Sequence, residues 1–347
     1  MSSLPQVWSD ATQSAPAQPQ LVKRSDARAC TVESSLSPQQ TNEAFWASRN
    51  LAARARDYSE LVKARVTMLI MVTAWCGFYF GALKSGTGWM NWSLIHAVFG
   101  VGMAAGGTAA LNEVMERDLD GRMRRTSRRP LVTGHMSLRH GLAVGVALVL
   151  GGSLYLALCA NWLSALLTLA TSVVYLAAYT PLKRVHPICT FVGAFPGAMP
   201  PVLGWTAIRG RLDVETLVLF AIVFLWQFPH FHSIAWLYWE DYDRAQIRML
   251  PVVEPDGRST ARQIVVYLAA LLPATIAPAW FAMAGKVYLA GALVLGVAFF
   301  WFGWRLAASG LAPQKAESRK LARHLLQASV LYLPLLFALM MLNARAS

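Results

Sequence analysis

The chain has 347 residues, of which 56% are hydrophobic and only 14% are charged, and its formal net charge is +13. A soluble domain cannot hide so large an apolar share, because much of its surface must be polar. The composition therefore excludes an ordinary soluble enzyme and predicts the lipid bilayer as a partner. The positive charge fits loops facing anionic lipid, so we expect no nucleic acid as a partner.

The first 55 residues are rich in Ser, Gln, Ala and Pro and differ in composition from the rest of the chain. They contain no apolar stretch long enough for the core of a secretion signal. Four acidic residues in this segment argue against a mitochondrial presequence. The composition predicts a disordered cytoplasmic tail over residues 1–55, followed by one membrane domain over residues 56–347.

Beyond the tail, long runs contain no Asp, Glu, Lys or Arg. They are 66–83, 85–112, 141–182, 185–208, 216–239, 263–285, 287–304 and 325–344. A membrane-spanning segment needs about 20 apolar residues, and lipid forces it to be helical. The run 141–182 is about twice that length and has a polar centre at Asn161, which predicts two helices and a tight turn. The predicted fold class is therefore all-α, a polytopic membrane protein with nine transmembrane helices in a bundle.

The basic residues predict how this bundle is oriented. With the N-terminus in the cytoplasm, the four loops on that side hold 18 Lys and Arg, whereas the opposite loops and the C-terminus hold five. Cytoplasmic loops of membrane proteins carry such an excess. We expect a multi-pass protein of the bacterial cell inner membrane, with a cytoplasmic N-terminus and a periplasmic or extracytoplasmic C-terminus, in preference to the mitochondrial inner membrane.

Acidic residues gather in two of the cytoplasmic loops, which follow spans two and six. Nine of the 18 acidic residues lie there. In the first loop Asn112, Glu116 and Asp120 are four residues apart, so they project from one face of a helix. An amide and two carboxylates are hard oxygen ligands that suit Mg²⁺ bridged to phosphate. The alternative is that these acids are solvated charges balanced by neighbouring arginines.

Basic side chains follow the same row. Arg125 and Arg129 come before the helix-breaking Pro130 and offer planar donors that match phosphate. The sequence "YTPLKR" ends span four at the same membrane face, and its Lys183 or Arg184 could close on a diphosphate. A short cytoplasmic loop can also carry such a pair without any functional role. Carboxylates, Mg²⁺ and arginine together indicate the chemistry of a diphosphate leaving group.

The second acidic loop has the sequence "WEDYDRAQIRMLPVVEPDG". Asp241 is followed by Ala245 four residues later, so this loop lacks a carboxylate pair at that helical spacing. We expect Asp241 to complete the metal's ligands from across the bundle. The prolines and the glycine at the end of the sequence break the helix and predict a lid.

Two intramembrane features favour a large flat ligand. Span five contains "GAFPGAMPPVLGW", whose prolines and glycines predict a broken helix that a substrate can approach closely. Span six contains "WQFPHFH", which places His230 and His232 inside the membrane, where ionisable side chains are costly and often functional. We expect His230 to contact a ligand; the alternative is that these histidines hydrogen-bond neighbouring helices.

These motifs resemble those of a known family. The spacing of Asn112, Glu116 and Asp120 is similar to the first acidic motif of the UbiA-type intramembrane prenyltransferases. Together with "RDLDGRMRRTSRRPLVTG", "YTPLKR", "WQFPHF" and "EDYDRAQIRMLPVV", it resembles the protohaem IX farnesyltransferase (haem O synthase) branch of that family. The similarity runs from about Tyr58 to the C-terminus.

The resemblance implies a helical bundle around a cytoplasm-facing cavity, in which farnesyl diphosphate alkylates a vinyl group of haem b and water adds to give haem O for haem–copper oxidases. It implies Mg²⁺ as the cofactor and a haem A synthase as a downstream partner. The residues expected to be catalytic are Asn112, Glu116, Asp120 and Lys183. Those expected to bind the metal are Glu116, Asp120 and Asp241. Those expected to bind substrate are Arg125, Arg129, Tyr179, Arg184 and His230.

Two other functions share parts of this pattern. A UbiA-type prenyltransferase that acts on an aromatic quinone precursor would have the same first acidic motif, but its second motif carries a later carboxylate that is missing here. A membrane transporter would use the acids as an ion pathway. Transporter acids usually lie near the middle of the membrane, whereas these lie at the ends of spans.

Overall fold

The computed structural model describes residues 51–345, and nearly all of this part of the chain is helical. Nine of its helices are long and apolar enough to cross a membrane. They are α3 (Ala64–Lys84), α4 (Trp92–Asp120), α5 (Leu138–Cys159), α6 with η2 and α7 (Trp162–Leu182), α8 (Cys189–Arg209), α9 (Val214–Leu237), α12 (Arg258–Trp280), α13 (Lys286–Ala308) and α14 (Ala316–Leu342). The predicted all-α bundle of nine spans is confirmed.

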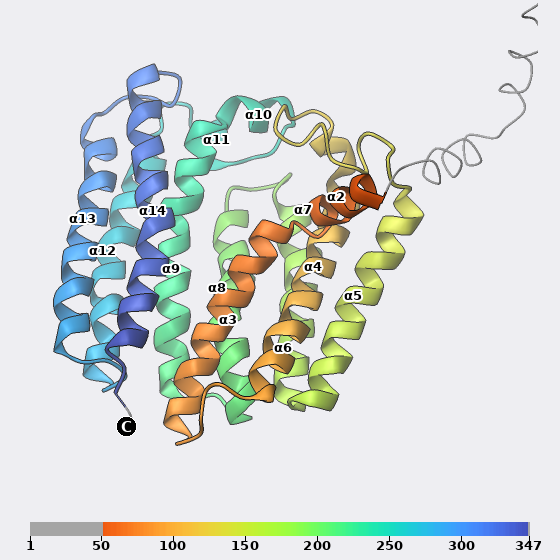
Figure 1. The fold of residues 1–347 in the computed structure, drawn as a ribbon. Helices are drawn as coiled ribbons and strands as arrows, with labels where there is room; N and C mark the ends of the chain where they lie inside the picture. Colours follow the sequence, from red (N-terminus) through yellow and green to blue (C-terminus); the bar gives the residue numbers. More distant parts are fainter. Residues whose placement is uncertain (1–50, 346–347) are drawn as a thin grey trace, which may run out of the picture.

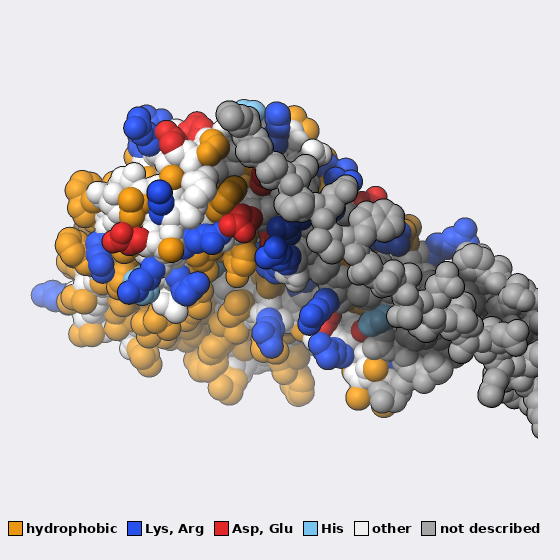
Figure 2. Space-filling model, turned by 90° about the horizontal axis from the view of Figure 1, so that it is seen from above, with side chains coloured by type: hydrophobic (Ala, Val, Ile, Leu, Met, Phe, Trp, Pro, Cys, Tyr) orange, Lys and Arg blue, Asp and Glu red, His pale blue; other side chains and the backbone are white. Residues whose placement is uncertain are grey.

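The outer faces of the spans are apolar, as lipid requires. Leu150, Leu154 and Leu158 of α5 are all more than half exposed, a surface that would be unfavourable in water. Figure 1 shows the spans side by side, with α2 (Leu51–Leu61), α10 (Trp239–Arg244) and α11 (Leu250–Val253) at one end and the C-terminus at the other. Charged side chains gather on the end that carries these short helices, and hydrophobic ones cover the flanks (Figure 2). The protein is a multi-pass membrane protein.

The predicted tail and the predicted domain meet inside α2. Residues 1–50 of the tail lie outside the described residues. The last five residues of the predicted tail, 51–55, belong to α2 and are helical.

The tight turn expected inside the run 141–182 is present, and Asn161 explains it. This side chain accepts a hydrogen bond from the Ser164 amide at 2.9 Å, which caps α6. Its Nδ2 donates to the carbonyls of Thr206 and Ala207 at 2.8 and 3.1 Å. The polar centre of the run therefore begins one span and fixes that span against α8.

Span five is not broken, so that expectation is wrong. The helix α8 is continuous despite Pro196, Pro200 and Pro201. Its Gly204 packs against α3 so closely that an added Cβ would lie 1.8 Å from the carbonyl oxygen of Ala74, and a Cβ on Gly77 would lie 1.8 Å from that of Pro201. The small residues therefore serve contact between α3 and α8, and at these two positions they leave no space for a substrate.

The segment 239–253, which contains α10 and α11, crosses one end of the bundle. The Arg248 amide donates to the carbonyl of Lys183 at 2.9 Å, which ties the segment to the end of span four. Glu240 pairs with Arg319 at the start of α14. The predicted lid is therefore this short helical segment, residues 239–253, which is bound to the end of span four and to the start of α14.

Candidate active site

The face of α4 that carries Asn112, Glu116 and Asp120 lines a cavity of about 300 Å³ at the charged end of the bundle. All three side chains are buried. The helix α4 continues without interruption to Asp120, so the four-residue spacing does place them in one row. The row expected from the sequence thus lies on the wall of a cavity.

Each member of the row is paired with one basic side chain from another part of the chain. Lys63 Nζ donates to Asn112 Oδ1 at 2.8 Å, and Lys183 Nζ to Glu116 Oε1 at 2.8 Å. Arg129 pairs with Asp120 at 2.5 Å. All three basic residues line the same cavity. The cavity therefore combines oxygen donors with three cations, which is the charge arrangement needed to hold an anion together with a metal ion.

Lys63 was not predicted to take part in the site. It lies between α2 and α3 with a φ of 47°, in the left-handed region. Burial lowers its pKa to about 8, and the nearby charges of Arg129 and Lys183 act in the same direction. Every basic residue before the first span fits the orientation rule equally well, so no separate signal in the sequence marks Lys63 as part of the site.

Lys183 and Tyr179 meet beside the row. Tyr179 belongs to the π-helix η2 (Tyr175–Tyr179), and Lys183 Nζ lies 4.4 Å from the centre of its ring. Burial disfavours the charged form of Lys183, but Tyr179 and Glu116 keep its pKa well above the ordinary value. Tyr175 also lines the cavity, with its ring 4.9 Å from that of Tyr179. A cation and two aromatic faces therefore lie next to one carboxylate.

Arg125 joins the loop after α4 to the lid. Its Nη2 donates to the hydroxyl of Tyr242 at 3.3 Å, and its guanidinium lies 5.1 Å from the ring centre of Tyr238. Arg125 and Tyr242 both line the cavity. Aromatic contacts thus hold the predicted phosphate-binding arginine in the cavity lining.

Much of the remaining cavity lining is apolar, although Thr126 and Thr190 also contribute to it. The apolar part is formed by side chains of α3, α9 and the lid, which are Val66, Phe231, Ile234, Ala235, Ile247 and Met249. A hydrocarbon chain attached to an anion bound at the row would lie against these side chains. The cavity is therefore polar on one side and apolar on the other, as an amphiphilic substrate requires.

Asp241 and Arg184 do not line the cavity, contrary to expectation. Asp241 Oδ1 accepts from Arg244 at 3.0 Å and from the Arg124 amide at 3.4 Å, so the carboxylate caps the loop after α4. Arg184 is exposed. It follows Lys183 directly, and the next residue in a helical turn points about 100° away.

His230 also lies outside the cavity lining, because it faces α14. Its Nδ1 lies 2.8 Å from Ser329 Oγ, and its ring stacks on Trp226 at a centroid distance of 4.8 Å. His232 pairs with Gln263 of α12 at 2.9 Å. Both histidines therefore make the helix contacts that were the alternative to ligand binding. Phe231, which lies between them in the chain, does reach the cavity.

The donors along α4 fit Mg²⁺ only in part. Within residues 51–345, no group of three or more His, Cys, Asp or Glu side chains is arranged to hold a metal ion. Glu116 and Asp120 line the cavity without Asp241. Mg²⁺ commonly takes one or two carboxylates and completes its octahedron with water and substrate phosphates. The two carboxylates fit that mode of binding, but they do not form a site made by the protein alone.

Glu113 is a further acidic residue of α4, outside the row, and we made no prediction for it from the sequence. It is fully buried, and neither of its carboxylate oxygens has a hydrogen-bond partner among the described residues. It does not line the cavity. Burying a carboxylate without hydrogen-bond partners is unfavourable. Glu113 is therefore a destabilising feature of the helix that carries the row.

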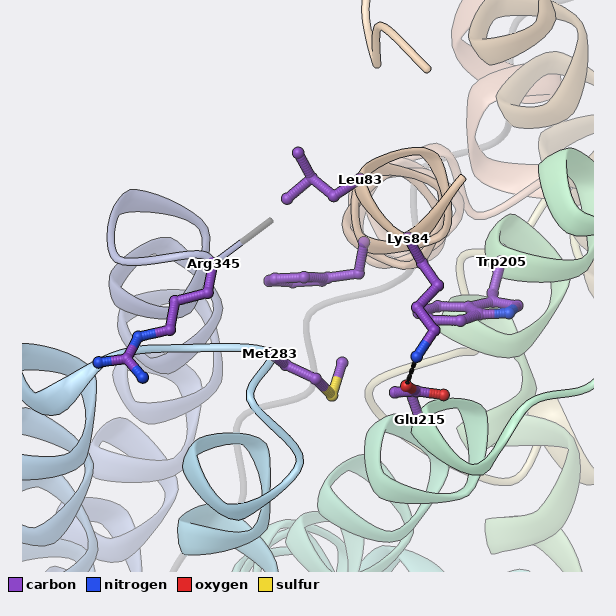
Figure 3. Close-up of a pocket in the computed structure, with 7 residues that line it drawn as sticks. Leu83, Lys84, Trp205, Glu215, Met283 and Arg345 are labelled. Atoms are coloured by element: carbon purple, nitrogen blue, oxygen red, sulfur yellow. Dashed lines mark hydrogen bonds and ion pairs between the residues drawn. The ribbon is translucent and has the colours of Figure 1, made fainter. Parts of the chain in front are cut away.

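A second, much smaller cavity lies at the opposite end of the bundle. Figure 3 shows it between Lys84, Glu215, Trp205, Met283 and Arg345. Lys84 Nζ pairs with Glu215 Oε1 at 2.6 Å. Its volume of about 10 Å³ is close to the space of a single water molecule. At this small cavity an ion pair therefore joins α3 to α9.

The chain is similar in sequence to known proteins. Residues 70–342 match the model of the UbiA prenyltransferase family. A protein named protoheme IX farnesyltransferase from Koribacter versatilis is 63% identical over 293 residues, which cover 84% of this chain and 94% of the relative. Another of that name from Solibacter usitatus is 49% identical and covers 83% of this chain and 98% of the relative.

Solved structures share the fold at low sequence identity. A digeranylgeranylglyceryl phosphate synthase has a TM-score of 0.66 at 13% identity and covers 84% of this chain and 98% of its own. A UbiA homolog from Archaeoglobus fulgidus bound to GPP and Mg²⁺ has a TM-score of 0.57 at 17% identity, over 82% of this chain and 99% of its own.

Proposed function

This chain belongs to the UbiA prenyltransferase family, and we propose that it transfers the farnesyl group of farnesyl diphosphate to a vinyl group of haem b. Relatives at 63% and 49% identity carry the name protoheme IX farnesyltransferase and match this chain over almost their whole length. The product of this reaction is haem O. The observation that carries the proposal is the pairing of Asn112, Glu116 and Asp120 with three cations on one cavity wall.

Glu116 and Asp120 would hold Mg²⁺ together with the diphosphate. When bound, the metal would stabilise negative charge on the departing diphosphate. A UbiA homolog was solved with GPP and Mg²⁺, which supports a divalent cation in this family. Asn112 would contribute its amide oxygen at the start of the row. Asp241 is left out of this set, because its carboxylate is committed to the loop after α4.

The basic residues of the cavity would bind the diphosphate and stabilise it as it leaves. Lys63, Lys183 and Arg129 each balance one member of the row, and Arg125 reaches the cavity from the loop after α4, where it donates to Tyr242 of the lid. When the diphosphate arrives, these side chains exchange a protein acceptor for a phosphate oxygen at little reorganisation cost. Preorganised donors of this kind are the largest source of transition-state stabilisation in many enzymes.

The reaction breaks the bond between C1 of the farnesyl chain and the diphosphate oxygen, and forms a bond between C1 and the vinyl carbon of haem. Water then adds to the resulting haem cation and releases a proton, which leaves a hydroxyethylfarnesyl group. Tyr179 and Tyr175 would face the allylic cation with their rings. The apolar wall would keep water away until the new carbon–carbon bond has formed.

Haem b would have to lie beside the apolar wall of α9. His230 follows Trp226 on the side of α9 that faces α14. It would contact haem only where the porphyrin extends from the cavity toward α14. The charged end of the bundle would face the cytoplasm of a bacterium whose inner membrane holds the protein. A haem A synthase would consume the product.

The test is a reaction of membranes that contain the protein with haem b, farnesyl diphosphate and Mg²⁺, followed by mass measurement of the haem. We expect a haem whose mass has increased by a farnesyl group and one hydroxyl group. The matched control is the Asp120→Asn protein at the same expression level. If unmodified haem is recovered while an added aromatic acid becomes prenylated, the protein is a quinone-type prenyltransferase and this proposal is wrong.

A further inference from the structure

Thr180 lies at the junction between the π-helix η2 and the short helix α7 (Thr180–Leu182). Its backbone amide donates to the carbonyl of Tyr175, five residues earlier. Its hydroxyl donates to the same carbonyl at 3.0 Å. In an α-helix a threonine hydroxyl bonds the carbonyl three or four residues earlier, so the wider turn selects this partner.

The same hydroxyl contacts the first residue of the α4 row. Asn112 Nδ2 donates to Thr180 Oγ1 at 3.3 Å, and both side chains are buried. Because the hydroxyl hydrogen is committed to Tyr175, the oxygen offers only lone pairs to α4. A lone pair accepts from the NH₂ group of an amide and repels its carbonyl oxygen.

The opposite side of the amide faces Lys63. The ammonium group has donors and no acceptor, so it requires the carbonyl oxygen of Asn112, and the observed distance to Oδ1 is 2.8 Å. Thr180 and Lys63 thus favour the same orientation from two sides. Of these three residues, Lys63 and Asn112 line the cavity and Thr180 does not.

We propose that Thr180 is a positioning residue which, through the π-turn, fixes the carbonyl oxygen of Asn112 toward Lys63 and the diphosphate site. The proposal rests on the function proposed above, because it concerns the same site. It assigns η2 a function as well. Without the extra residue of the π-turn, Thr180 would be rotated by about 100° around the helix axis and would lose Asn112.

The test measures binding of inorganic pyrophosphate with Mg²⁺ to the purified full-length protein, alongside kcat/KM for farnesyl diphosphate. Thr180→Val removes the hydroxyl and keeps the shape. We expect it to weaken pyrophosphate binding about tenfold, the lower end of what the loss of an orienting partner costs in such sites. Thr180→Ser keeps the hydroxyl, and it should restore binding to the wild-type level.

Thr108→Val is the matched control. Thr108 is on α4 four residues before Asn112, and its hydroxyl pairs with Ser172 of α6 at 2.8 Å. It does not line the cavity. This variant removes a similar contact between α4 and span four, so its pyrophosphate binding should equal that of the wild type.

A double-mutant cycle separates positioning from general damage. If Thr180 acts through Asn112, then Thr180→Val added to Asn112→Ala weakens binding no further. A second drop of the same size in that background overturns the proposal, and so does wild-type binding by Thr180→Val. If Thr180→Val gives no folded protein, Thr180→Ala replaces it in the cycle. Thr180→Ala also removes the hydroxyl, and its side chain is smaller than that of threonine. Failure of wild-type membranes to modify haem would overturn the proposed function alone, because pyrophosphate binding still tests Thr180.

Discussion

The ammonium group of Lys63 lies 2.8 Å from the amide oxygen of Asn112, although 49 positions separate the two residues in the chain. Lys63 adopts a left-handed backbone conformation just before α3. That conformation costs roughly 1–2 kcal/mol for a residue other than glycine. A sterically costly turn that delivers a lysine into a cavity is typical of a functional position.

Replacing Lys63 by methionine should weaken the enzyme more than it weakens the fold. The variant keeps the length of the side chain but loses a charge-assisted hydrogen bond, which is worth about 1.5–3 kcal/mol. We expect kcat/KM for farnesyl diphosphate to fall by about 10–100-fold. Lys63→Arg should retain most activity, since it keeps the charge. Equal activity of Lys63→Met and the wild type would remove Lys63 from the site.

The pKa of Lys63 predicts a loss of activity in mild base. Burial, followed by Arg129 and Lys183, lowers this pKa to about 8. The ammonium form, which would bind diphosphate, is therefore present below that pH in the free enzyme and disappears above it. We expect kcat/KM to decline as the pH rises through about 8, because kcat/KM reports groups of the free enzyme.

Lys63→Arg provides the comparison for this pH profile, because arginine stays charged throughout the range. The decline of kcat/KM should occur at higher pH in Lys63→Arg than in the wild type. If both proteins lose activity at the same pH, another group controls the profile.

Much of the fold could be predicted because the bilayer imposes simple rules on the sequence. Charge-free runs of sufficient length must be spanning helices, and Asn161 marked the one turn hidden inside a double-length run. The row of Asn112, Glu116 and Asp120 followed from helical spacing alone. Each of these inferences is local, since it needs only neighbouring residues on one helix.

The parts that could not be predicted from the sequence depend on contacts between distant segments. Lys63 reaches the row only because α3 packs against α4 and α8. Asp241 lies in an acidic loop as expected, yet Arg244 and the Arg124 amide take up its carboxylate. The glycines of α8 were expected to leave space for a substrate, but α3 occupies that space at Gly204. Tyr179 and Gln227 occupy it at Gly193 and Gly197. Sequence spacing does not reveal which neighbour fills a position.

Asp120→Asn should abolish haem O formation while leaving expression and haem binding nearly intact. The change removes a charge that would hold Mg²⁺, and loss of one such interaction typically lowers kcat by at least about 100-fold. Asp118→Asn is the matched control, because Asp118 is exposed on another face of α4 and does not line the cavity. Chelation of divalent cations should stop the wild-type reaction, and Mg²⁺ should restore it. Full turnover by Asp120→Asn would exclude the proposed metal role.

His230→Ala should weaken retention of haem more than binding of farnesyl diphosphate. The pairing of Nδ1 with Ser329 leaves Nε2 as the nitrogen that could meet haem. His96→Ala is the control, since His96 is also a histidine in a span and pairs with Tyr155 of the neighbouring helix at 2.7 Å. The measurement is the haem absorption spectrum of the purified proteins. An unchanged spectrum and unchanged haem content in His230→Ala would mean that this histidine only joins α9 to α14.

Gly204→Ala should destabilise the bundle and also impair the site. The added Cβ would lie 1.8 Å from the Ala74 carbonyl, so α3 and α8 must move apart. Overpacking of this kind costs about 1–3 kcal/mol. Because Lys63 directly precedes α3, the shift should also reduce affinity for farnesyl diphosphate. Gly88→Ala is the control, since nothing lies within 4 Å of its added Cβ. Thermal unfolding in detergent should show a lower midpoint for Gly204→Ala alone, and equal midpoints for both variants would contradict the close packing of α3 on α8.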